Sequence, residues 1–322
     1  MADIDPAVRS VDPAFRADVL AGLAAPIPAI PARWFYDHRG SELFEEITRL
    51  PEYYPTRTET ALLERYSGEI AAQVGSGEAV IEFGSGSSAK TPILLRAVQP
   101  AAYVPVDISG DFLRESAAGL QSAFPGLPIL PVEADFTRTF ELPGAVRDVA
   151  KLGFFPGSTI GNFVARSAVD LLRAMKETLG EGARLVIGMD RIKDVDILIR
   201  AYDDAAGVTA AFNLNLLHRI NAELDGDIPV DAFRHKAIWN DALSRIEMHL
   251  EAVRDVAFPV SGRRFAFRQG ETIHTENSHK YGHRDSRILL RAAGWGVVAE
   301  WTDEQQWFSI LLAEAEPARF AP

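Results

Sequence analysis

The chain has 322 residues, of which 47% are hydrophobic and 24% are charged, so it is long and apolar enough for one large α/β domain or for two domains. Its net charge of −12 argues against binding to nucleic acid, which requires clustered Lys and Arg. The absence of cysteine excludes disulfides, zinc–thiolate sites and thiol nucleophiles.

Two further features set the expected location. No stretch of the sequence approaches the roughly 18 apolar residues that a transmembrane helix needs. The N-terminal segment is acidic and lacks the basic and apolar regions of a signal peptide. We therefore expect a cytoplasmic protein that acts on a small molecule, without a nucleic-acid or membrane partner.

Residues 1 to about 75 show helical periodicity. Apolar residues recur at intervals of three to four in 41–50 and again in 56–74. Between these segments, two prolines bracket Tyr53 and Tyr54 in an expected turn.

From residue 79 the pattern changes to strands that alternate with helices. Short apolar runs lie at 79–84, 102–108, 128–136, 151–155 and 183–190, and helical segments at 88–98, 109–124 and 167–179 separate most of them. This alternation predicts an α/β fold with a doubly wound, Rossmann-like parallel sheet. Ligands of such a sheet bind at the carboxyl ends of its strands.

After residue 190 the alternation stops. We expect a helix over 194–224 and strands at 244–253, 256–260 and 263–269, then a helix over 284–295. The last two runs, 297–303 and 307–315, could complete the sheet as a closing antiparallel pair. This organisation predicts a cofactor-binding domain from 62–190 and 286–322, and a smaller α+β substrate-binding cap from 1–61 and 191–285.

A glycine-rich turn follows the first strand in "IEFGSGSSAK". Gly84 and Gly86 allow the backbone to approach a ligand closely, and the following helix N-terminus favours negative charge. The spacing fits a nicotinamide dinucleotide as well as S-adenosylmethionine, and a tight turn without any ligand also satisfies it. Glu82, two residues before Gly84, could contact the methionine part of a cofactor or orient the loop.

Acidic residues close the next two strands. Asp107 could accept hydrogen bonds from both ribose hydroxyls, and Asp135 from an adenine amino group beside the ring of Phe136. Each acid alone could instead cap a helix. Together with Glu82 they resemble class I S-adenosylmethionine-dependent methyltransferases, because a nicotinamide enzyme has no use for the third acid.

The fourth strand runs into the turn "FFPGSTIGNF". Asn162 in this turn offers two donors and one acceptor, enough to hold the amine and the carboxylate of one amino acid. A tight turn in which Asn162 caps the next helix is the competing interpretation.

Six segments carry a more specific resemblance, in the same order along the chain: "FYDHRGSELFEEITRLPEYYPTR", "IEFGSGSSAKT", "VDIS", "EADF", "FPGSTIGNF" and "IHTENS". Together they resemble the L-histidine Nα-methyltransferases of ergothioneine biosynthesis, from about Trp34 to Ala313. The resemblance implies that one enzyme transfers three methyl groups from S-adenosylmethionine to the α-amine of histidine, through mono- and dimethyl forms, and releases hercynine.

The resemblance also implies roles for individual residues. The residues expected to hold the cofactor are Tyr36, Glu82, Gly84, Ser85, Gly86, Lys90, Asp107, Asp135 and Phe136. The residues expected to hold histidine are Tyr53, Gly157, Asn162, Tyr202, Met248, Glu276 and Ser278, with Tyr53 and Asn162 aiming the amine. Tyr53 fits the family spacing from Tyr36 better than its neighbour Tyr54 does. Asn277 departs from the aliphatic residue expected there, and in an extended segment it should point away from Glu276 and Ser278.

Three alternatives remain open. His274, His279 and His283 with Glu276 form a ligand-rich stretch, but their spacing is not that of a helical zinc motif, so we expect no metal. A methyltransferase for another amino acid or small amine is the second alternative. The third is a non-catalytic binding protein that retains the cofactor fold, against which the intact acids and Asn162 argue. We expect a monomer.

Overall fold

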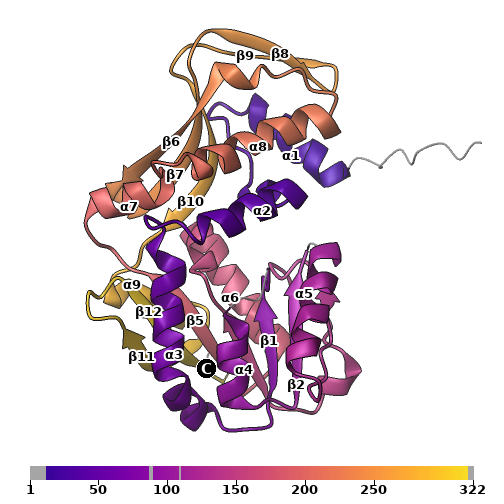
Figure 1. Ribbon diagram of the computed structural model, residues 1–322, viewed down its shortest axis with the longest axis vertical. Coiled ribbons are helices and arrows are strands. Elements are labelled where there is room, and N and C mark those ends of the chain that lie inside the picture. Colours follow the sequence, from indigo (N-terminus) through magenta and orange to yellow (C-terminus); the bar gives the residue numbers. More distant parts are fainter. Residues whose placement is uncertain (1–11, 87–89, 109, 318–322) are drawn as a thin grey trace, which may run out of the picture. The chain divides into compact units, whose positions relative to one another are not determined.

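The computed structural model describes residues 12–86, 90–108 and 110–317. Contacts divide the chain into two compact units. The sheet unit comprises Thr48–Ala201, Trp239–Ile246 and Asn277–Pro322. The second unit comprises Met1–Ile47, Tyr202–Ile238 and Glu247–Glu276, and Figure 1 labels the elements of both.

The sheet unit is built on a seven-stranded sheet in the order β11-β12-β5-β4-β1-β2-β3. The strands are β1 (Ala79–Phe83), β2 (Ala102–Asp107), β3 (Val132–Glu133), β4 (Lys151–Phe155), β5 (Arg184–Asp190), β11 (Trp295–Thr302) and β12 (Phe308–Ala315). The first five pair in parallel, and β12 pairs antiparallel with both β5 and β11. This topology confirms the doubly wound, Rossmann-like sheet and its closing antiparallel pair.

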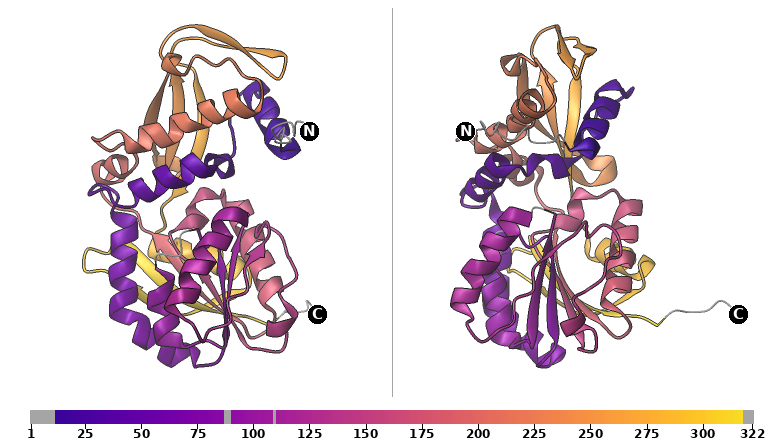
Figure 2. Two further views of the ribbon diagram at one scale, coloured as in Figure 1. Left: turned by 45° about the vertical axis from the view of Figure 1, so that its right-hand side comes forward. Right: turned by 90° about the vertical axis from the view of Figure 1, so that its right-hand side faces the viewer.

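Helices cover both faces of this sheet because its strands are apolar on both sides (Figure 2). In β1, Ile81 and Phe83 pack with residues of α6 (Ala165–Leu179) and α9 (His283–Ala292). Val80 faces the opposite cluster, which holds residues of α3 (Tyr54–Val74), α4 (Thr91–Val98) and α5 (Gly110–Ala123). Shorter elements of this unit are η2 (Gly144–Val146) and η3 (Thr159–Asn162), and α7 (Val195–Tyr202) runs from it into the second unit.

The second unit contains a three-stranded sheet in the order β10-β7-β6 and an antiparallel hairpin of β8 and β9. The strands are β6 (Phe233–Asn240), β7 (Arg245–Ala252), β8 (Val256–Val260), β9 (Arg263–Phe267) and β10 (Thr272–His279). The helices are α1 (Pro13–Ala24), η1 (Ala32–Phe35), α2 (His38–Ile47), α8 (Val208–Glu223) and η4 (Val230–Ala232), and η5 (Asp241–Leu243) lies in the sheet unit after β6.

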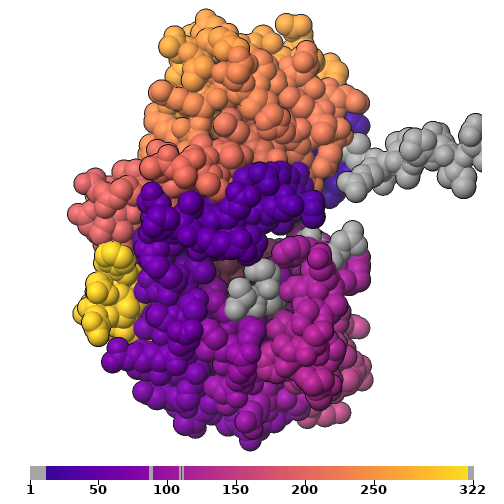
Figure 3. Space-filling view, in the orientation of Figure 1, coloured from indigo at the N-terminus to yellow at the C-terminus, as the bar shows by residue number. Residues whose placement is uncertain are grey.

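Aromatic packing joins the helices of the second unit. The ring of Phe212 in α8 lies 4.6 Å from that of Phe35 and 6.1 Å from that of Phe44 in α2, between ring centroids. The atoms of α2 (indigo) lie directly against those of α8 (orange) in the space-filling view (Figure 3).

Several expected boundaries were wrong. The single helix over 194–224 is two helices, because Gly207 adopts a positive φ of 75° and Asp204 caps the new helix at Val208 and Thr209. The third strand shrinks to two residues, because Pro131 cannot donate a ladder hydrogen bond. Helix α3 already begins at Tyr54, with Pro55 in its first turn, where no amide donor is needed.

Two of the expected domain limits fall inside helices of the structure. Residue 61 falls inside α3, and residue 285 falls inside α9. Contacts change unit instead at 47/48 and at 276/277, the latter within β10. Among the described residues, no helix has both the length and the apolar character needed to cross a membrane.

Candidate active site

The glycine-rich turn after β1 lies beside the end of β2. Gly84 and Gly86 have positive φ angles of 69° and 47°, a conformation that favours glycine. The backbone N–H of Gly84 donates to Val106 O at 2.8 Å, and that of Gly86 to Asp107 Oδ2 at 3.2 Å. A Cβ at Gly84 would lie 3.4 Å from the ring of Phe136. The structure therefore brings the turn, Asp107 and Phe136 together, while 87–89 lie outside the described residues.

Ser85 and Asp135 complete this edge of the sheet. Ser85 N donates to Val106 O at 3.1 Å. Ala134 N donates to Asp107 O at 3.1 Å, which places the segment after β3 beside the end of β2. The Asp135 carboxylate accepts from both the backbone N and the hydroxyl of Thr137, at 3.0 and 2.6 Å. The acids expected at the ends of strands two and three thus lie at one edge.

Glu82 is buried within the sheet unit. Its Oε2 accepts hydrogen bonds from Thr91 Oγ1 and Tyr103 Oη, both at 2.6 Å. Burial raises the pKa of Glu82 to about 7. Glu82 therefore ties the first residue of α4 to β2.

Lys90 and Gly157 share a buried partner that the sequence did not reveal. Lys90 Nζ forms an ion pair with Glu59 of α3, whose side chain is 1% exposed. The same carboxylate accepts from Gly157 N at 2.8 Å. Gly188 makes room for it, because a Cβ there would collide with Glu59. Glu59 thus joins α3, the loop before α4 and the turn after β4.

The turn that carries Asn162 is fixed by the end of β10. Ser158 has a positive φ of 55°, and its Oγ accepts from Asp190 N at 2.8 Å. His279 Nδ1 lies 2.8 Å from Gly161 O, and a Cβ at Gly161 would lie 2.9 Å from His279 O. The turn ending at Asn162 is therefore in contact with the residue that follows Ser278.

A buried charge cluster lies at the end of β5. Tyr54 Oη donates to Asp190 Oδ2 at 2.6 Å, and Lys280 Nζ lies 2.7 Å from the same atom. Lys193 Nζ also bonds Asp190 and lies 2.7 Å from Tyr54 Oη. The two ammonium groups hold the pKa of Asp190 below its usual range although burial opposes this, and burial lowers the pKa of Lys193 to about 8.

The second unit holds four of the expected site residues: Tyr36, Tyr202, Met248 and Glu276. The ring of Tyr36 packs edge-on against Phe44 at 5.6 Å, and Tyr202 O lies 2.7 Å from His235 Nε2. Met248 on β7 is buried, and its carbonyl accepts from Thr275 Oγ1 at 3.0 Å. The neighbouring strands β7 and β10 thus place Met248 beside the residue that precedes Glu276.

The sequence matches the family described as "Histidine-specific methyltransferase, SAM-dependent" over residues 15–315. The chain belongs to this family. It is 42% identical over 95% of its length to the Histidine N-alpha-methyltransferase of Mycolicibacterium smegmatis, of which it covers 97%. It is 41% identical over 93% of its length to that of Mycobacterium tuberculosis, of which it covers 94%. It is also 31% identical over 89% of its length to Ergothioneine biosynthesis protein 1 of Neurospora crassa, of which it covers 33%.

The family assignment confirms the resemblance found in the sequence. The chain is a methyltransferase that depends on S-adenosylmethionine, and the nicotinamide alternative is wrong. The non-catalytic alternative is likewise wrong. The roles of single residues stay predictions.

The three histidines between residues 274 and 283 of the methyltransferase lie in different surroundings. His279 bonds Gly161 O, and His283 Nδ1 lies 2.9 Å from Glu300 Oε2, both in the sheet unit. His274 instead stacks on His249 in the second unit, with ring centroids 4.9 Å apart. The polar stretch 272–279 is thus strand β10 and not a loop.

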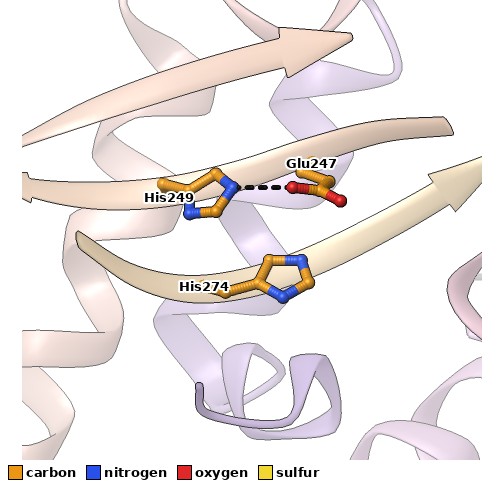
Figure 4. Close-up of side chains that lie close together, drawn as sticks. All are labelled: Glu247, His249 and His274. Carbon is orange, nitrogen blue, oxygen red and sulfur yellow. Dashed lines mark hydrogen bonds and ion pairs between the residues drawn. The ribbon is translucent and has the colours of Figure 1, made fainter. Parts of the chain in front are cut away.

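Glu247, His249 and His274 form a polar cluster on β7 and β10 (Figure 4). Each offers one possible ligand atom, and these atoms lie within 4.8 Å of one another. His249 Nε2 lies 3.1 Å from Glu247 Oε2, and His274 Nε2 lies 3.0 Å from Glu276 O. A carbonyl oxygen only accepts, so His274 Nε2 carries the proton in this arrangement and Nδ1 keeps the lone pair.

Four buried or half-buried residues beside the candidate site were not predicted from the sequence: Glu59, Asp190, Lys193 and Lys280. The one local signal is the acid that ends β5 in "VIGMD", at the same edge as Asp107. Two partners of Asp190, Tyr54 and Lys280, lie far away in sequence, so only the fold identifies them.

Proposed function

We propose that the methyltransferase transfers three methyl groups in succession to the α-amine of L-histidine and releases hercynine, the first step of ergothioneine biosynthesis. The observation that carries this proposal is the match with Histidine N-alpha-methyltransferases over nearly the full length of both chains. The name of the Neurospora crassa relative supports the pathway. Methylation of another amino acid is the alternative.

The proposed cofactor residues are those expected from the sequence, and their contacts fit the chemistry of S-adenosylmethionine. The Asp107 carboxylate, at the end of β2, can accept hydrogen bonds from ribose hydroxyls while Gly86 N holds one of its oxygens. The aromatic face of Phe136 borders a turn whose glycines leave room for a ligand. When bound, S-adenosylmethionine supplies an electrophilic methyl group.

The proposed histidine residues are Tyr53, Gly157, Asn162, Tyr202, Met248, Glu276 and Ser278. In-line methyl transfer requires a neutral amine whose lone pair points at the methyl carbon. Tyr53 and Asn162 can accept from the amine and aim it. The nitrogen loses one proton before each of the three transfers, because only the neutral amine has a lone pair to attack the methyl carbon. The engagement of the Tyr54 hydroxyl with Asp190 and Lys193 supports Tyr53 over Tyr54 for this role.

The other proposed contacts follow from side-chain chemistry. Glu276 and Ser278 would hydrogen-bond the imidazole, and the buried thioether of Met248 would pack on its ring. Tyr202 and Asn162 would hold the substrate carboxylate. Residues 1–61 and 191–285 would supply most histidine contacts. We further propose a cytoplasmic monomer; its molar mass in solution, by light scattering, tests the oligomeric part.

The proposal is tested by methyl transfer to a panel of amino acids. Purified protein is incubated with isotopically methyl-labelled cofactor and either histidine, tryptophan, lysine or glycine. The proposal expects label in histidine at a kcat/KM at least about 100-fold above that for the others. Equal labelling of tryptophan would favour the alternative, and no label in any amino acid would contradict both.

A further inference from the structure

The hydroxyl of Ser278 is in contact with a buried ammonium group. Lys280 Nζ lies 2.7 Å from Ser278 Oγ, and the Lys280 side chain is 0% exposed. An ammonium group has three donors and no acceptor, so Ser278 Oγ must be the acceptor of this hydrogen bond. One acceptor position of the hydroxyl is thereby occupied.

Lys280 is held in this position from two sides. Its ammonium group lies 2.7 Å from Asp190 Oδ2, and its backbone N–H donates to Ser244 O at 2.8 Å. Because Asp190 is itself completely buried, the ion pair is screened little by solvent. The ammonium group of Lys280 is therefore held beside Asp190, away from solvent.

Asp190 is in turn fixed by neighbouring elements. Its carboxylate accepts from Tyr54 of α3 and from Lys193, which follows β5. Its backbone N–H donates to Ser158 Oγ in the turn after β4, and its carbonyl accepts from Tyr281 N at 2.9 Å. The position of Lys280 is thus set by the framework of the sheet unit and not by the Ser278 side chain.

We propose that Lys280 is a specificity-determining positioning residue, which orients the Ser278 hydroxyl so that its proton is donated to the imidazole of the substrate. This proposal rests on the proposed function, in which Ser278 contacts the imidazole. A hydroxyl has one proton, and with Lys280 on the acceptor side that proton points elsewhere.

The orientation selects one kind of ring. Neutral imidazole has one nitrogen with a lone pair, which can accept the proton of Ser278. An imidazolium ring and an indole ring carry only N–H donors, so neither can accept a proton from Ser278. Lys280 therefore favours neutral histidine over protonated histidine and over tryptophan, without touching the substrate.

A double-mutant cycle tests this relationship. The dissociation constant of histidine is measured by calorimetry, with S-adenosylhomocysteine bound, for wild type, Ser278→Ala, Lys280→Met and the double variant. Each single change should weaken histidine binding about tenfold, the loss of one oriented hydrogen bond. The double variant should be within twofold of Ser278→Ala, because Lys280 acts only through that hydroxyl.

Control variants separate positioning from folding. Lys280→Met leaves Asp190 paired with Lys193, so the cluster keeps one positive and one negative charge. Lys280→Gln can still donate to Ser278 Oγ and should bind histidine within about threefold of wild type. Lys236→Met removes an exposed lysine paired with Glu251 and should have no effect. The affinity for S-adenosylhomocysteine should stay within twofold in every variant.

A pH series on wild type gives an independent readout. Histidine binding should weaken up to about tenfold per pH unit below the imidazole pKa of about 6.5, because protonation removes the acceptor nitrogen. Affinity that is unchanged between pH 7.5 and 5.5 would overturn the proposal, as would additive effects in the cycle or an equal loss of S-adenosylhomocysteine binding. If wild type binds histidine, these outcomes contradict only the proposed role of Lys280. If wild type does not bind histidine, the proposed function is contradicted as well.

Discussion

Tyr54 Oη donates to Asp190 Oδ2 at 2.6 Å, which joins the first residue of α3 to the last residue of β5. Lys193 Nζ lies 4.2 Å from the centroid of the same tyrosine ring, and the Trp307 ring packs edge-on at 5.3 Å. These contacts fix the chain next to Tyr53. The two adjacent tyrosines should therefore have different roles, one in the framework and one in the reaction.

Matched substitutions separate these roles. Tyr54→Phe removes hydrogen bonds to two buried charged groups, and should lower the free energy of unfolding by about 1–3 kcal/mol. Tyr53→Phe should leave stability nearly unchanged but lower kcat/KM for histidine at least about tenfold. Urea denaturation and steady-state kinetics measure the two effects. The assignment would be reversed if Tyr54→Phe lost activity at full stability.

Glu82 should make stability depend on pH. Its pKa is raised from 4.5 to about 7 by burial, so between these values the folded protein binds more protons than the unfolded chain. The unfolding free energy should therefore fall as the pH rises from about 4.5 to about 7, by on the order of 3 kcal/mol at most. Glu82→Gln stays neutral and can still accept from Thr91 and Tyr103. The unfolding free energy of this variant should therefore fall less over the same pH range. If the unfolding free energies of wild type and Glu82→Gln changed in parallel with pH, the raised pKa of the Glu82 carboxyl would be contradicted.

Asp107 should contribute to cofactor binding. Asp107→Ala removes the acceptor at the end of β2 and the hydrogen bond from Gly86 N. The dissociation constant of S-adenosylhomocysteine should rise about 10- to 100-fold, as expected for the loss of charge-assisted hydrogen bonds. Calorimetry measures this change, and Asp170→Ala on the exposed side of α6 serves as the control. If the Asp107 variant bound S-adenosylhomocysteine with wild-type affinity, Asp107 would not be the residue that binds the ribose hydroxyls.

Glu276 should act on the substrate and not on the cofactor. Glu276→Ala should raise KM for histidine much more than KM for S-adenosylmethionine, because an interaction with the imidazole is lost. Glu304→Ala, on an exposed carboxylate that lies 3.7 Å from Arg65 Nη1 at the surface, should alter neither KM value. Equal increases in both KM values would contradict the placement of Glu276.

Metal chelation should leave the rate unchanged. The proposed transfer is a displacement by an amine on a methyl sulfonium and needs no metal ion, although Glu247, His249 and His274 bring possible ligand atoms within 4.8 Å of one another. Turnover with and without EDTA checks this expectation. If EDTA removed the activity, zinc restored it in wild type, and zinc failed to restore it in His249→Ala, the cluster would be a metal site instead.

The sheet and its cofactor edge could be predicted because their signals are local. The parallel strands all run in one direction, so the residues after β1, β2 and β3 meet at one edge of the sheet. Gly84, Gly86 and Asp107 could thus be grouped from sequence, and the hydrogen bond from Gly86 N to Asp107 joins two of them directly.

The buried charges could not be predicted in the same way. Asp190 binds Tyr54, 136 residues earlier, and Lys280, 90 residues later. Lysine and aspartate in a sequence ordinarily indicate a solvated surface, so nothing local marks them as buried. The length of β3 was also mispredicted. The apolar run at 128–136 predicts a longer strand, but Pro131 within that run limits β3 to two residues.

The most direct test of the account is the product itself. Histidine and excess S-adenosylmethionine are incubated with the protein, and the products are identified by mass spectrometry with fragmentation. The account predicts a product carrying three methyl groups, all on the α-nitrogen, after transient mono- and dimethyl forms. A product that stops at one methyl group, or that is methylated on the imidazole ring, would contradict it.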